Sequence, residues 1–365
     1  MEKKNKEQSS KNKLSFMKRH ARITLVNKLF FTQQLEVMAR TGFSLSRALE
    51  TISLQMENRR FKQIIENMKA IVEKGSPLSK AASEYPKVFS ETFVSMVAAG
   101  ESSGKLDEAL KRLTIQLKKS HEIRTKIKNA LTYPAIVLIA MVAIGIAMLI
   151  FVLPKITAIY EESGTKLPLP TRVLIGTSDF IIANGIYISI LIIVLIIALL
   201  RYVKTPRGKK LFHKILLVLP IVGPIIRKIN LANFSRSLSS LLQTDIPIVE
   251  TFKIISRTSS NIYYKEYLAN AAEELKKGVS VKNILEKDRT LFPPLITQII
   301  NIGEESGTLD TISEEIANFY EEEVSQTMAN LATIIEPVLM LILGVGVGAI
   351  AVAVVMPMYS LVNTI

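Results

Sequence analysis

The sequence predicts an all-α membrane protein with two homologous helical-bundle domains and three transmembrane helices. Three observations predict this fold class. The second half of the chain repeats the first, three long segments carry no charge, and apolar residues elsewhere recur at helical spacing. The repeat is considered first because a repeated unit defines the architecture of the chain.

The repeat aligns residues 31–160 with residues 234–363 at a constant offset of 203, without a gap. Its most similar stretches are GESSGKLD (100–107) and GEESGTLD (303–310). Each copy is a mixed polar segment followed by an apolar run, so one unit is a soluble domain plus the membrane helix after it. Thirteen informative positions are identical in the two copies: Phe31/Phe234, Leu35/Leu238, Thr41/Thr244, Gly75/Gly278, Phe89/Phe292, Gly100/Gly303, Glu101/Glu304, Ser103/Ser306, Gly104/Gly307, Leu106/Leu309, Asp107/Asp310, Pro134/Pro337 and Pro154/Pro357.

Three segments lack charged residues over 19, 21 and 22 positions, namely residues 135–153, 180–200 and 337–358. A helix of about 20 apolar residues spans a bilayer, so each segment predicts one transmembrane helix. A fourth apolar segment, residues 215–226, is shorter and contains Pro220 and Pro224. We expect this segment to be interfacial or buried instead.

The repeat and the distribution of Lys and Arg predict the topology. Two copies with the same role should face the same side, and helix 180–200 supplies the return crossing that this needs. The domain-side flanks of the first two membrane helices hold five Lys or Arg residues each, against three in loop 154–179. Because cytoplasmic flanks are the basic ones, both domains and the N-terminus are predicted to be cytoplasmic. The predicted order is a basic tail (1–26), a first cytoplasmic helical domain (27–132), a membrane helix (133–154), a short external loop (155–176), a second membrane helix (177–201), a second cytoplasmic helical domain (202–335), a third membrane helix (336–358) and an external C-terminus (359–365).

The net charge of +14 is concentrated in residues 1–132, which hold 26 Lys or Arg and 13 Asp or Glu. In a membrane protein the anionic lipid surface is the nearest partner for a basic tail. We therefore expect contact with the lipid bilayer and no nucleic-acid partner; a solvated tail without a partner is the alternative. The chain has no cysteine, which excludes disulfides and thiolate metal sites.

Each soluble domain is predicted to be a bundle of short helices. The helices expected in the first copy are residues 28–40, 45–56, 59–73, 77–84, 91–99 and 105–130. Gly42 and Gly75 stand where left-handed caps belong. Pro134 and Pro337 are expected to interrupt and kink the last helix of each copy where it enters the membrane.

The stretch GESSGK departs from a phosphate-binding loop in spacing and composition. Three residues rather than four separate its glycines, Leu106 stands where a magnesium-binding hydroxyl is required, and Thr308 replaces Lys105 in the second copy. The glycines instead indicate tight turns between helices, because glycine tolerates positive φ. These predicted structural turns are at Gly100, Gly104, Gly303 and Gly307. We recognise no catalytic, cofactor-binding or metal-ligating set in the sequence.

The helix that follows this turn is basic in the first copy and acidic in the second. Its candidate contact residues are Lys111, Arg112, Lys118 and Lys119, which align with Glu314, Glu315, Glu321 and Glu322. A spacing of seven places these clusters near one helical face. We hypothesise that the two helices face each other, within one chain or between neighbouring subunits. The alternative is two independent solvated faces, with the basic face near anionic lipid.

In the third membrane helix, Gly344 and Gly348 form a GxxxG pattern. Small residues at this spacing let helices approach closely in lipid, so both are candidates for helix packing.

Several short motifs point together to one family. They are the two GE(S/E)SG turns, LTYPA (131–135), LPLPTRVL (167–174), TPRG (205–208) and IEPVLM (335–340). From about residue 27 to its end, the chain resembles the type II secretion system protein F family, which includes the platform proteins of type IV and competence pili. One departure is Asp245, which occupies a position where the family commonly has glycine.

The resemblance implies a non-enzymatic, multi-pass platform protein of the bacterial inner membrane, without a cofactor. Such a protein would couple a cytoplasmic assembly ATPase to the insertion of pilin or pseudopilin subunits. Its partners would include other inner-membrane assembly proteins and further copies of itself. The alternative is a small membrane transporter or channel subunit, which would need polar residues inside spans that have almost none.

Overall fold

The computed structural model describes residues 22–152 and 169–362, and every regular element in these ranges is a helix. The all-α prediction is therefore confirmed. Parts of the predicted tail, external loop and C-terminus lie outside the described residues. The described part of the predicted loop is helical, because α9 (Leu169–Lys204) begins at Leu169.

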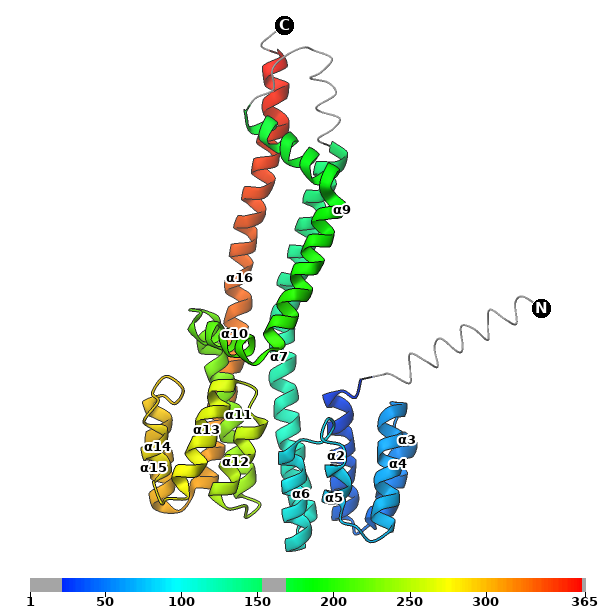
Figure 1. Cartoon of the computed structure of the whole chain (residues 1–365), viewed down its shortest axis with the longest axis vertical. Helices are drawn as coiled ribbons and strands as arrows, with labels where there is room; N and C mark the ends of the chain where they lie inside the picture. The colour runs from blue at the N-terminus through cyan, green and yellow to red at the C-terminus, as the bar shows by residue number, and fades with distance from the viewer. Residues whose placement is uncertain (1–21, 153–168, 363–365) are drawn as a thin grey trace, which may run out of the picture. The chain divides into compact units, whose positions relative to one another are not determined.

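The first repeat is a bundle of short helices that leads into one long helix (Figure 1). Its elements are α2 (Leu25–Arg40), α3 (Leu45–Gln55), α4 (Arg59–Glu73), α5 (Leu78–Ser83), α6 (Glu91–Ser103) and α7 (Leu106–Ala147), and a π-helical turn η1 (Met148–Val152) follows. The core is built around Phe31, whose ring centroid lies 5.5 Å from those of Phe61 and Phe89. Gly42 and Gly75 end their helices with positive φ, as glycine at a left-handed cap does.

The second repeat has the same order of helices. Its elements are α11 (Val222–Leu242), α12 (Ile248–Thr258), α13 (Ile262–Leu275), α14 (Val281–Leu285), α15 (Pro294–Ser306) and α16 (Leu309–Val362). At the offset of 203, α12 and α15 have the same bounds as α3 and α6. Phe234 and Phe292 pair in the core at 5.2 Å and are the counterparts of Phe31 and Phe89. The repeat in sequence is thus a repeat in structure.

By its backbone contacts the chain divides into two units. The first holds both repeats, residues 22–124 and 213–324. The second holds residues 125–152, 169–212 and 325–362. Because α7 and α16 each continue from one unit into the other, neither repeat is joined to its membrane segment by a loop.

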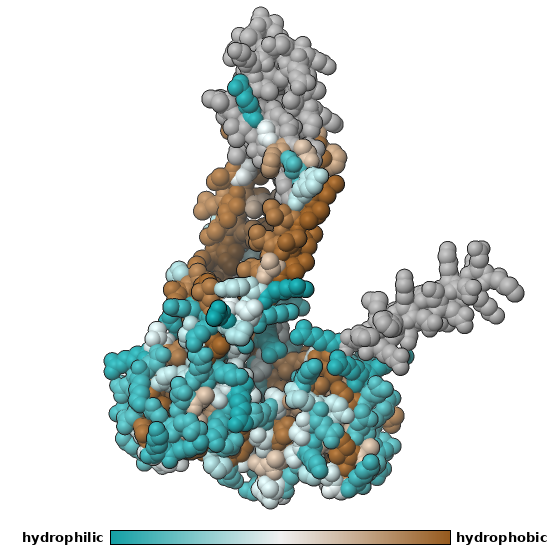
Figure 2. All heavy atoms as spheres, viewed as in Figure 1, coloured by the Kyte–Doolittle hydropathy of each residue, from teal (hydrophilic) through white to brown (hydrophobic). Residues whose placement is uncertain are grey.

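In the described part of the chain, three helices are long and apolar enough to cross a membrane, as predicted: Leu106–Ala147, Ala183–Lys204 and Leu309–Gly348. Hydrophobic side chains cover their apolar parts (Figure 2). Ile186 and Leu191 of α9, for example, are 76% and 63% exposed. Exposed apolar surface of this extent is suited to lipid rather than water.

The short apolar segment around residue 220 lies at a sharp bend. Helix α10 (Pro206–Val218) meets α11 at an angle of 105°, and only the two together are long and apolar enough to cross a membrane. Because α11 buries Phe234, Leu238 and Leu241 in the second repeat, we assign it to that bundle.

The expected interruptions at Pro134 and Pro337 are not observed. Both prolines lie inside helices of 42 and 54 residues. A proline removes one backbone donor, and the remaining hydrogen bonds of a long helix tolerate that loss, especially at membrane depth.

Candidate functional site

The two repeats contact each other within the first unit, and they do so through unlike faces. Helices α6 and α7 of the first repeat face α11 and α12 of the second. Four side-chain pairs among the described residues of this unit join the two repeats, the last of them reaching α16: Glu91 with Arg257, Arg112 with Gln243, Gln116 with Ser237, and Lys119 with Glu321. The Gln116 amide donates to the Ser237 hydroxyl at 3.1 Å, and Lys119 Nζ lies 3.5 Å from a Glu321 oxygen.

Arg236 of α11 pairs with carboxylates of the acidic helix α16 inside the second repeat. Its side chain is buried and donates to both carboxylate oxygens of Glu321, at 2.8 and 2.9 Å. It also donates to Asn318 at 2.6 Å and lies 3.7 Å from Glu314. A bidentate guanidinium–carboxylate pair is among the strongest polar contacts in a protein, so Arg236 is the main partner of Glu321.

Arg236 was not among the residues predicted from the sequence. The available signal was an arginine between Phe234 and Leu238, two positions that are identical in the two repeats. A charge in that setting needs a partner, and the aligned carboxylates of the last helix were the candidates.

The eight candidate charges therefore have different environments. Lys119 meets Glu321 directly, and Arg112 reaches Glu314 through Gln243, whose amide donates to that carboxylate at 2.9 Å. The other four residues are exposed: Lys111, Lys118, Glu315 and Glu322.

The GE(S/E)SG stretch has a second structural role, carried by its glutamate. Both oxygens of Glu304 accept from backbone amides at the start of α14, from Val281 at 2.7 Å and Lys282 at 3.1 Å. Glu101 accepts in the same way from Leu78 and Ser79 at the start of α5. A carboxylate at a helix N-terminus satisfies free N–H groups and the helix dipole, so this residue joins two helices in each repeat. The sequence repeat showed that both positions hold glutamate, but it did not reveal the structural reason.

The four glycines of this stretch fall into two classes. Gly104 and Gly307 cap α6 and α15 with φ of 71° and 69°. Gly100 and Gly303, expected in turns, lie inside those helices instead. A Cβ on Gly100 would come within 2.6 Å of the Ala109 Cβ, and one on Gly303 within 3.0 Å of the Ile312 Cβ. The reason for glycine at these two positions is thus close packing against the next helix.

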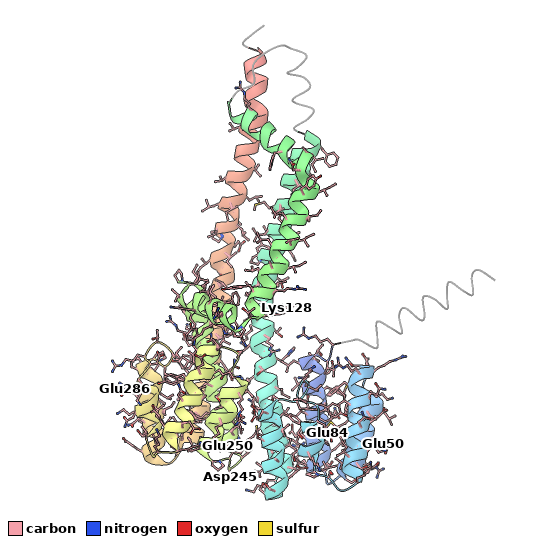
Figure 3. The ribbon with its side chains drawn as sticks, in the orientation of Figure 1. Glu50, Glu84, Lys128, Asp245, Glu250 and Glu286 are labelled. Carbon is pink, nitrogen blue, oxygen red and sulfur yellow. The ribbon has the colours of Figure 1, made fainter. Side chains whose placement is uncertain are left out.

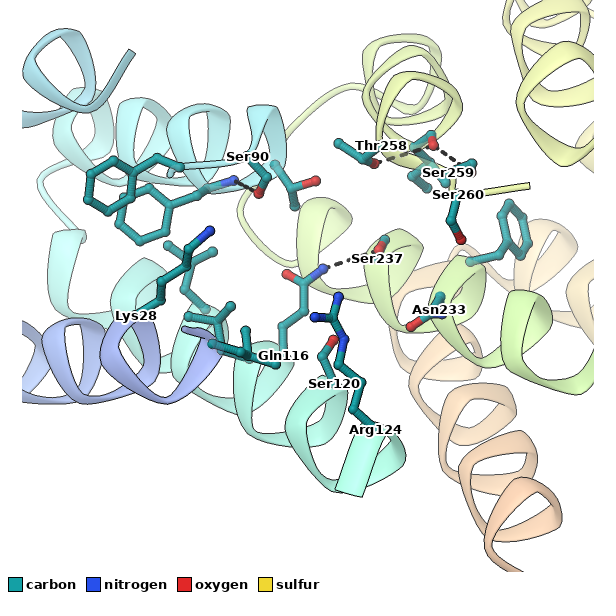
Figure 4. A pocket seen from close by; sticks show the side chains of 18 of the residues that line it. Lys28, Ser90, Gln116, Ser120, Arg124, Asn233, Ser237, Thr258, Ser259 and Ser260 are labelled. Atoms are coloured by element: carbon teal, nitrogen blue, oxygen red, sulfur yellow. Dashed lines mark hydrogen bonds between the residues drawn. The ribbon is translucent and has the colours of Figure 1, made fainter. Parts of the chain in front are cut away.

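A cavity of about 310 Å³ lies between the repeats, lined by residues of α2, α6, α7, α11 and α12 (Figure 4). Two cations, Lys28 and Arg124, line it, and its described lining contains no carboxylate. Burial, and then the charge of Arg124, lower the pKa of Lys28. The buried Gln116 Oε1 accepts no hydrogen bond from the described residues.

The remaining predicted residues are Gly344 and Gly348. A Cβ added to either would meet no atom within 4 Å among the described residues beyond their own helix. The described residues therefore do not test whether these glycines support helix packing. Within the same described ranges, no group of three or more His, Asp or Glu side chains is arranged to hold a metal.

These features define a class: a multi-pass membrane protein with paired homologous helical domains, whose polar side chains serve helix capping and domain contact. A model of the family "Type II secretion system (T2SS), protein F" matches residues 31–154 and 234–357, more than half of the chain. The chain belongs to this family, and the two matched segments are related by the same offset of 203 as the repeat.

Full-length relatives agree. The chain is 36% identical to the type IV pilus assembly protein PilC of Thermus thermophilus over 335 residues, covering 92% of this chain and 82% of that protein. It is 32% identical to PilC of Myxococcus xanthus, over 92% and 81% of the two chains. It is 30% identical to the type II secretion system protein F of Aeromonas hydrophila, over 92% and 86%. Members of the family are non-enzymatic inner-membrane platform proteins of type II secretion or type IV pilus assembly, and so is this chain.

Proposed function

We propose that this platform couples a cytoplasmic assembly ATPase to the insertion of pilin or pseudopilin subunits. The observation that carries the proposal is the continuity of α7 and α16. Each runs from a soluble repeat into an apolar segment without a break, over 42 and 54 residues. At 1.5 Å per residue these helices are about 60 and 80 Å long. A displacement of a repeat is therefore passed along a helix rather than lost in a loop.

The proposal places both repeats in the cytoplasm and the chain in the inner membrane. The Lys and Arg residues that flank the first two spans support this orientation. Thiol labelling tests it, since the natural chain has no cysteine. Lys277→Cys, at an exposed position of the second repeat, should resist an impermeant maleimide added outside the cell, whereas Thr364→Cys should react. Labelling of Lys277→Cys from outside would contradict the orientation.

The coupling itself is tested by two matched insertions between Asn129 and Ala130 of α7. A flexible GGSGGSG insertion separates the repeat from the span mechanically. A helical AEAAAKA insertion adds about two turns and nearly preserves the helical phase. We expect filament assembly to be lost with the first and retained with the second, while both variants insert in the membrane and copurify with the ATPase. Normal assembly with the flexible insertion would contradict coupling through α7.

A further inference from the structure

The contact between the two repeats is asymmetric, so that within the described residues the equivalent face of each repeat does not contact the other repeat. The first repeat contributes α6 and α7, and the second receives them on α11 and α12, with Glu321 of α16. Because the repeats share one fold, the first repeat has its own receiving face on α2 and α3. The second repeat correspondingly has its own inserting face on α15 and α16. We propose that these two faces bind each other between neighbouring copies of the chain, so that copies associate head to tail.

The residues that meet between copies follow from the repeat offset. In each intrachain pair, the residue of the first repeat is replaced by its counterpart 203 positions later, and the residue of the second repeat by its counterpart 203 positions earlier. The four pairs become Glu315 with Arg40, Glu322 with Lys118, Pro294 with Leu54, and Phe319 with Gln34. Both transposed charge pairs are of opposite sign, although every residue in them differs from its counterpart inside the chain. The third pair is apolar on both sides. Opposite charges in two pairs and apolar residues in a third are what a second use of the same interface requires, whereas the fourth pair, Phe319 with Gln34, joins an apolar and a polar side chain.

The exposure of these residues agrees with the proposal. Leu54 is 72% exposed and Phe319 is 48% exposed, so each presents apolar surface that a second copy would bury. Arg40, Lys118, Glu315 and Pro294 are also exposed. Leu295, next to Pro294, is 48% exposed, whereas its counterpart Thr92 in the first repeat is buried. The faces left open in one copy thus carry apolar centres with flanking charges, basic on one face and acidic on the other.

The interface would be heterologous, because different surfaces of the two copies meet. Such an interface forms a ring when its rotation closes and an open array when it does not. It also assigns roles to the candidate charges that the intrachain contact leaves exposed. Lys118 and Glu322 act between copies, while Lys119 and Glu321 act within one.

Cross-linking between two differently tagged full-length chains tests the arrangement. One chain carries Leu54→Cys and the other Pro294→Cys, each as its only cysteine. We expect a short bismaleimide to join unlike chains when they are coexpressed, and neither chain to itself. Gln63→Cys with Lys277→Cys, at exposed positions of α4 and just beyond α13, is the matched control and should not cross-link. Dimers of like chains, or cross-linking no stronger than the control, would overturn the proposal.

A charge exchange tests the pairing itself. Arg40→Glu with Lys118→Glu turns two attractive exposed pairs into repulsive ones, and we expect association in detergent to weaken roughly tenfold. Adding Glu315→Arg and Glu322→Lys to the same chain should restore it, because each copy then presents the exchanged charges to the next. All four positions are exposed, so the thermal unfolding midpoint of the natural chain should be kept. Undiminished association of the first variant, or no recovery in the second, would contradict the proposal.

Discussion

The first helices of the two repeats, α2 and α11, show how a duplicated fold diverged. Both bury the same phenylalanine and leucine, Phe31 and Leu35 in one and Phe234 and Leu238 in the other. Only α11 is also buried on a further face, where Arg236 stands at the position that exposed Gln33 holds in α2. The two repeats thus share their core. Their outer faces differ, because those of α11 are covered by the other repeat and by the acidic helix α16, whereas the matching face of α2 is exposed.

The largest expected effect comes from removing this difference at Arg236. Arg236→Gln makes the position match Gln33 but leaves the buried Glu321 without its bidentate partner. We expect a loss of about 3–5 kcal/mol in the free energy of unfolding, as for other broken buried ion pairs. Gln33→Ala should change stability by less than about 0.5 kcal/mol. Thermal melts of the purified protein measure both, and Glu321→Gln added to Arg236→Gln should recover part of the loss. Equal effects at the two positions would show that the repeats do not differ here.

The glutamate of the GE(S/E)SG stretch should behave alike in the two repeats. Glu101→Ala and Glu304→Ala each remove a carboxylate that accepts from two backbone amides of a neighbouring helix. The expected loss is about 1–3 kcal/mol for each variant. Glu108→Ala, an exposed position early in α7, is the control and should be nearly neutral. The prediction fails if one repeat tolerates the change and the other does not.

The capping glycines should also behave alike. Gly104→Val and Gly307→Val place a β-branched residue at φ of 71° and 69°. Each should destabilise its helix junction by about 1–3 kcal/mol and lower the amount of folded protein in membranes. Normal abundance with a selective loss of ATPase binding would indicate a docking role for this turn instead.

The smallest expected effect concerns Gly42 and Asp245, which occupy equivalent positions after α2 and α11. Both have positive φ, 77° and 60°, and Asp245 is the only non-glycine residue with positive φ in the described chain (its place is labelled in Figure 3). Asp245→Gly should relieve strain and raise stability by up to about 1 kcal/mol, and Gly42→Asp should lower it by a similar amount. A lower melting temperature for Asp245→Gly would show that its side chain contributes more than its backbone strain costs.

Much of this fold could be predicted from the sequence, because its determinants are local. Helical periodicity and glycine caps gave the bounds of α3, α4 and α5 to within a residue, and uncharged runs gave the three spans. Features that depend on packing were not predictable in this way. Gly100 was wrongly expected in a turn, because the actual reason for glycine there, its close approach to Ala109, is a tertiary contact. The role of Glu101 likewise depends on a helix start more than 20 residues earlier in the chain. The continuity of α7 through Pro134 was not predicted, because we assumed the helix-breaking effect that proline has in a soluble helix.

The paired repeats are tested most directly by a cross-link inside one chain. Glu91→Cys and Arg257→Cys replace a pair that joins α6 of the first repeat to α12 of the second. In an otherwise cysteine-free chain, a short bismaleimide should close a loop within the molecule. The product should migrate faster in denaturing gels at unchanged mass, and dilution should not reduce its yield. A product of doubled mass, or no product while each single variant labels fully, would contradict the contact between the two repeats within one chain.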